Sequence, residues 1–94
     1  MRSQRHFEMR SETALREAAQ IRTLIADLDR VIQILNCDIA SEEERTRAFD
    51  RSDAKYPMLA RTLTARRDNL KNTVAALEQR LATMKAPLFE PVAA

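Results

Sequence analysis

The sequence predicts an all-α protein, a long antiparallel two-helix coiled-coil hairpin. Two observations support this fold class. The 94 residues include no Gly, no Trp, three Phe and one Tyr, and 32% of them are charged. Gly usually supplies the positive φ angles that the turns of β-rich and α/β folds need, so those folds are disfavoured, and the composition is typical of long helices. The second observation is a heptad repeat that covers most of the chain.

The first helix is predicted over about residues 8–50. Apolar or small residues recur at alternating intervals of four and three from Phe7 to Ile39, and the frame continues through Glu42 to Phe49. This is the spacing of the a and d positions, which form the contact seam of a coiled coil. A helix of this length is a rod of about 60 Å.

A turn is predicted over about residues 51–56. Ser52 or Asp53 can cap the start of the following helix, because both side chains accept hydrogen bonds from exposed backbone amides. Pro57 suits a first helical turn, where its missing N–H costs nothing.

The second helix is predicted over about residues 57–85. A second heptad series runs without a skip from Ala60 to Leu88. Because two prolines follow Met84, we expect an irregular tail over residues 86–94. The chain is thus predicted to be one domain.

Arg67 occupies a seam position and helps to choose between two registers of the hairpin. One register places Arg67 opposite Leu35, where a guanidinium would be buried on aliphatic carbon without a partner. The other places it opposite Glu42, as a single charge-paired layer that fixes the register, and we prefer this one. In that register much of the stretch from Arg2 to Thr23 has no partner within the chain.

No catalytic, metal or cofactor site is expected. Two helices cannot enclose a pocket, and His6, the single histidine, has no candidate partner ligands. Cys37 is followed by Asp38, and an acidic neighbour disfavours a reactive thiolate. The run Glu42-Glu43-Glu44 points in three directions around a helix. We therefore expect a protein that is not an enzyme.

Charge and hydropathy argue against nucleic-acid binding and membrane insertion. The formal net charge is +2, with the two signs interspersed, so no basic stripe is formed. The longest run without a charge is far shorter than the roughly 20 residues of a membrane span. A single cysteine forms no internal disulfide and fits a reducing compartment, so a cytoplasmic location is expected.

Two groups of residues are candidate partner-binding sites. The first is Leu24, Val31 and Ile34, which lie beside the seam and widen its apolar face on one side. They predict self-association, with a homodimer that closes into a four-helix bundle as one form of it. The second group is an outward-facing polar run, which consists of Arg66, Asp68 and Asn69.

Three segments in the middle of the chain resemble the FliJ-type flagellar export proteins of alphaproteobacteria, of which this would be a short or divergent member. They are the acidic helix end Glu42-Glu43-Glu44-Arg45, the turn ending in Tyr56-Pro57, and the run Arg66-Arg67-Asp68-Asn69-Leu70. The similarity covers about residues 28–81. It implies an antiparallel coiled coil that acts as the stalk of a hexameric export ATPase and contacts the export gate and substrate chaperones.

Two other functions stay open on the sequence. Helical hairpins with acidic tips can enter the secondary channel of RNA polymerase, and the predicted turn carries Asp50 and Asp53. A purely structural scaffold made of several copies of this chain is the other alternative.

Overall fold

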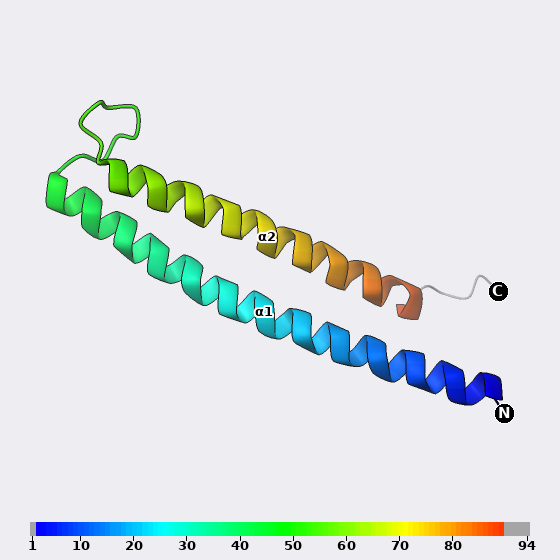
Figure 1. Cartoon of the computed structure of the whole chain (residues 1–94). Helices are drawn as coiled ribbons and strands as arrows, with labels where there is room; N and C mark the ends of the chain where they lie inside the picture. The colour runs from blue at the N-terminus through cyan, green and yellow to red at the C-terminus, as the bar shows by residue number, and fades with distance from the viewer. Residues whose placement is uncertain (1, 90–94) are drawn as a thin grey trace.

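The chain folds into two long antiparallel helices joined by a loop (Figure 1). The computed structural model describes the backbone of residues 2–89 and the side chains of residues 11–84. Helix α1 (Arg2–Thr46) has 45 residues and α2 (Met58–Phe89) has 32. The molecule measures 68 × 25 × 13 Å, so it is a rod. The predicted all-α helical hairpin is confirmed.

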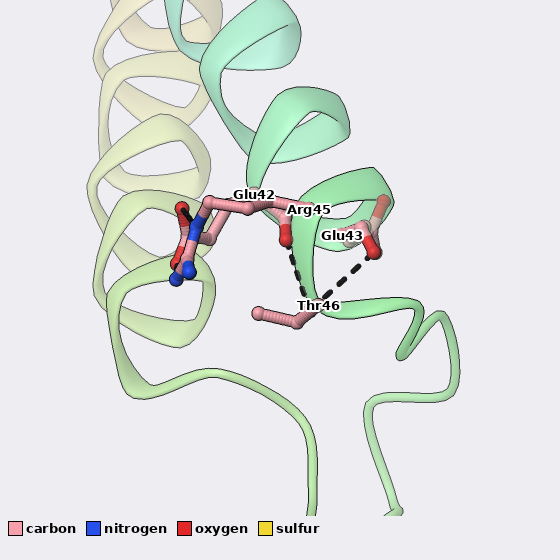
Figure 2. Close-up of polar contacts among 4 residues, drawn as sticks. All are labelled: Glu42, Glu43, Arg45 and Thr46. Carbon is pink, nitrogen blue, oxygen red and sulfur yellow. Dashed lines mark hydrogen bonds and ion pairs between the residues drawn. The ribbon is translucent and has the colours of Figure 1, made fainter.

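Helix α1 ends at Thr46, four residues before its predicted end. Arg47 has a φ angle of 57°, in the left-handed region that commonly terminates helices. Gly usually occupies this position, but the chain has none, and an arginine takes its place. The single proton of the Thr46 hydroxyl is shared between the backbone carbonyl oxygens of Glu42 (2.9 Å) and Glu43 (3.4 Å), which supports the last turn (Figure 2).

Helix α2 continues to Phe89, beyond its predicted end near residue 85. The prediction of an irregular tail is therefore wrong for residues 86–89, and residues 90–94 lie outside the described part of the chain. Pro87 does not end the helix. A proline near a helix end removes one backbone hydrogen bond, whereas the heptad series itself runs on to Leu88.

The seam between the helices buries small and medium-sized apolar residues. Ile32, Leu35 and Ile39 of α1 and Val74 of α2 are all buried. Among the described side chains, no large one is completely buried. The interior is therefore a single layer of contacts along the rod, which leaves little stabilising area per residue.

The loop between the helices is built from two successive turns. The Asp53 amide donates to the Asp50 carbonyl and the Tyr56 amide donates to the Asp53 carbonyl, each at 3.0 Å. The Asp50 carboxylate accepts from the Ser52 amide and hydroxyl, and the Asp53 carboxylate accepts from the Lys55 amide. Ser52 and Asp53 therefore stabilise the loop itself, and the prediction that one of them caps α2 is wrong.

The predicted pairing of Glu42 with Arg67 is also wrong. Arg67 Nη1 donates to Asn36 Oδ1 across the helix pair at 3.1 Å, and its Nε donates to Asp68 at 3.2 Å. Glu42 instead binds Arg45 of its own helix, with an Nε–Oε2 distance of 3.2 Å (Figure 2). The register is thus close to the one that we rejected, because the Asn36 amide supplies the partner that the guanidinium needed.

The corrected register shortens the part of α1 that lacks a partner. Arg80 near the end of α2 forms an ion pair with Glu17, and the next seam residues, Ala18 and Ile21, are buried. Helix α2 therefore covers α1 at least from residue 17 onward, and the expectation that much of the stretch from Arg2 to Thr23 is unpaired is wrong for its last residues.

Candidate interaction surfaces

The groove between the helices has a polar side and an apolar side. On the polar side, Arg67 donates to Asn36, and the Tyr56 hydroxyl donates to Glu43 at 2.8 Å. Asn36 and Glu43 are one heptad apart, so they share a face of α1. We call this side, defined by these four residues, the polar flank. Its cross-helix bonds fix how the two helices align.

The apolar side carries three of the residues that the sequence singled out. Leu24 and Val31 follow Glu17 by one and two heptads, so they lie on the side of the groove where Glu17 meets Arg80. Ile34 lies next to Val31 on the outer face of α1. We call Leu24, Val31 and Ile34 the apolar strip. Their exposed fractions are 45%, 38% and 54%, respectively, so the predicted exposure of this face is observed.

A shallow depression of about 340 Å³ adjoins the apolar strip on α1. It is lined by Ala19 together with Gln20, Thr23, Leu24 and Asp27. The last four residues have the spacing i, i+3, i+4 and i+7, which forms the hole that receives one side chain of a facing helix in a coiled coil. Helix α2 lies against a different face of α1, so this hole is open in the single chain.

The predicted polar run does not form one site with the apolar strip. Arg66, Asp68 and Asn69 are all exposed. Arg66 precedes Arg80 by two heptads and so lies on the side of the strip, whereas Asp68 pairs with Arg67 at 3.1 Å on the polar flank. Asn69 lies on the outer face of α2. The six predicted partner-binding residues are therefore divided among three faces.

Tyr56 is an anchor at the hairpin end that the sequence analysis did not assign. Its side chain is 4% exposed and forms a small buried cluster with Ala48 and Ala60. The Arg61 guanidinium lies 5.3 Å from the ring centroid and donates to the Asp53 carbonyl at 2.9 Å. Burial raises the pKa of Tyr56, and the neighbouring Glu43 carboxylate raises it further. The sequence signal for this anchor is that the single tyrosine of the chain directly precedes a proline at the end of the predicted turn.

A second apolar surface lies at the hairpin end. Phe49 in the loop and Met58 and Leu59 at the start of α2 are 57%, 77% and 52% exposed. We call these three residues the tip patch. Phe49 was expected in the seam because α1 was predicted to continue to residue 50, whereas the heptad frame did not single out Met58 or Leu59.

A second depression lies at the hairpin end, between the loop and the first turns of α2. It has a volume of about 290 Å³, is lined by Arg51, Tyr56, Arg61, Thr64, Ala65 and Asp68 and is widely open to solvent. Within the described residues, no group of three or more His, Cys, Asp or Glu side chains could hold a metal ion.

Comparison with known proteins adds no relative. No protein-family model matches the chain, and neither a curated protein nor a solved structure is significantly similar to it. In the part of the chain that the structure describes, neither helix is long and apolar enough to cross a membrane. The resemblance to FliJ-type proteins therefore stays a prediction.

Acid should weaken the end of α1. Hydrogen bonding to Arg45 holds the pKa of Glu42 below its ordinary value, and the bonds from Ser52 do the same for Asp50. A carboxylate whose pKa is lowered by folding adds stability above its unfolded pKa, and this is lost as the pH falls through its folded pKa. We expect Glu42→Gln to lower the melting temperature slightly at pH 7 and to leave it unchanged below the carboxylate range.

This expectation can be checked by circular dichroism melts at neutral and acidic pH. Glu78→Gln, which changes an exposed glutamate of α2, is the matched control. A difference between Glu42→Gln and the parent that is equally large in acid would contradict the electrostatic explanation.

Proposed function

We propose that this chain is a non-enzymatic coiled-coil adaptor that binds proteins through its exposed apolar residues. The observation that carries the proposal is the apolar strip, in which three large side chains remain exposed on one side of the groove. Contiguous apolar surface of this kind marks interaction sites in soluble proteins. The seam and the polar flank already join the two helices, and the exposed side chains of the strip are left on the surface.

The narrower form of this proposal is a cytoplasmic role in the flagellar type III export ATPase complex, as its stalk or chaperone-escort component. The resemblance over about residues 28–81 supports it, and so does the antiparallel two-helix hairpin. In this role the partners are the export ATPase or the export gate. The exposed Arg66 and Asn69 belong to the run on which the resemblance depends.

A capture experiment tests the adaptor function. Tagged parent chain is used as bait in lysate of a flagellated alphaproteobacterium, beside a variant in which Arg66 and Asn69 are both changed to Ala. Recovery of the export ATPase or gate by the parent, reduced in the variant, supports the narrower proposal. Recovery of neither by any bait overturns it.

RNA polymerase is the alternative partner that the same experiment can reveal. The structure gives this alternative little support, because the Asp50 and Asp53 carboxylates both accept hydrogen bonds within the loop. A regulator of this class needs free carboxylates to act beside a catalytic metal. Capture of polymerase that is lost in Asp50→Asn would nevertheless replace the adaptor proposal.

A further inference from the structure

We propose that the apolar strip is covered by a second copy of this chain, which packs α1 against α1 in an antiparallel two-fold dimer. This inference rests on the proposed function in one respect, that the strip is an interaction surface, and it names the molecule that occupies it. Three features support it. They are an open hole and the exposed Ile34 on the same face of α1, the order of the charges between them, and the surface area of the chain.

The open hole on α1 and the exposed side chain of Ile34, which is the knob, can fit one another in two copies of the chain. The depression at Gln20, Thr23, Leu24 and Asp27 is an open hole of coiled-coil geometry. Ile34 lies ten residues after Leu24 on the same strip and is the most exposed of its three side chains. A two-fold axis at the level of Asp29 places Ile34 of each copy at the hole of the other. The same residues then serve both partners, as an isologous interface requires.

The charges next to the strip favour the antiparallel arrangement. Asp27 lines the hole, and Arg30 lies one turn further along the helix, 3.7 Å from Asp27 in its own chain. With the axis at Asp29, Arg30 of one copy is level with residue 28 of the other, beside its Asp27. The two Arg30 and two Asp27 side chains then form one group of zero net charge beside the strip.

The surface area of the chain agrees with association. The accessible surface is 7702 Å², whereas a compact monomer of 10.8 kDa has about 5,500 Å². The excess of about 2,200 Å² comes from the rod shape, which leaves a long surface of α1 open to a partner. The apolar strip is straight, so a second rod-shaped molecule can lie along it, and a second copy of this chain has that shape.

Sedimentation equilibrium of the purified chain tests the dimer. At tens of micromolar we expect twice the chain mass of 10.8 kDa for the parent. Ile34→Glu should raise the dissociation constant at least tenfold and yield a monomer, because each dimer contains the substituted contact twice. Leu15→Glu is the matched control: Leu15 is 64% exposed and lies nine residues before Leu24, on the opposite side of α1. It should leave the dimer intact.

The native Cys37 provides the second measurement, since it is exposed and is the single cysteine. In the proposed dimer the two copies of Cys37 are separated by about 24 Å along the helices. Pulsed electron resonance on spin-labelled protein should therefore give a distance of this size or longer. A parallel dimer would give a shorter one, close to the 8–10 Å between neighbouring helices plus the label lengths.

Three results would overturn the inference: a monomeric parent, a dimer that Ile34→Glu does not weaken, or a short Cys37 distance. None of these uses another protein, so they are separate from the capture experiment. A monomeric parent that still captures the export ATPase would overturn the dimer alone. A dimer that captures neither the export ATPase nor the export gate would overturn the narrower proposed function alone.

Discussion

Tyr56→Ala should destabilise the hairpin by about 3–5 kcal/mol, the usual cost of truncating a buried aromatic side chain. Tyr56 is 4% exposed, bonds to Glu43 of α1 and closes the loop onto both helices. The seam elsewhere is a single layer, and small domains are only marginally stable. A loss of this size should therefore leave much of the chain unfolded at 25 °C.

Tyr56→Phe separates burial of the ring from the hydrogen bond. It keeps the aromatic ring and removes only the bond to Glu43, which is part-buried, so we expect a loss of about 1 kcal/mol. Urea unfolding of both variants in the Ile34→Glu background keeps self-association out of the comparison. Equal effects of the two substitutions would contradict the role of the ring as the anchor of the tip.

Arg67→Leu should stabilise the chain by about 1 kcal/mol. The Arg67 side chain is 15% exposed at the level of Leu35, and an aliphatic residue in such a layer often matches or exceeds a buried polar pair. Asn36 is half-buried, and water can hydrate its amide when the guanidinium is removed. A destabilised Arg67→Leu would show that the cross-helix hydrogen bond contributes more than the apolar contact that leucine adds.

Double-mutant cycles distinguish the observed register from the one that the sequence favoured. Combining Arg67→Leu with Asn36→Ala should show a coupling of about 0.5–1 kcal/mol, because the two side chains share a hydrogen bond. Combining it with Glu42→Ala should be additive to within about 0.5 kcal/mol. Coupling to Glu42 in place of Asn36 would contradict the structure.

The heptad frame predicted the elements well because it depends on many residues at once. The seam series placed Ile32, Leu35, Ile39 and Val74 in the interior, and all four are buried. The helix ends and the register depend on single residues instead. The sequence does not show that Arg47 adopts a left-handed conformation, and without that helix end both registers were compatible with the turn.

The candidate surface was predicted in part for the same reason. Exposure of Leu24, Val31 and Ile34 follows from the heptad positions alone, so these residues were found. The hole at Gln20 to Asp27 depends on which face α2 covers, and the exposure of Met58 and Leu59 depends on how the loop leaves the end of α1. The hydrogen bond from Arg67 to Asn36 was not predicted, because the heptad frame pairs only facing a and d positions and Asn36 lies beside one of them.

The central claim is that the apolar strip is the surface through which this hairpin binds a copy of itself, while the polar flank fixes its register. The most direct test is the attenuation of methyl NMR signals by a soluble nitroxide, measured at low and at high protein concentration. We predict that the methyl groups of Leu24, Val31 and Ile34 become protected as the concentration rises, while those of Leu15 stay accessible. Unchanged attenuation at the strip, or equal protection of Leu15, would contradict the claim.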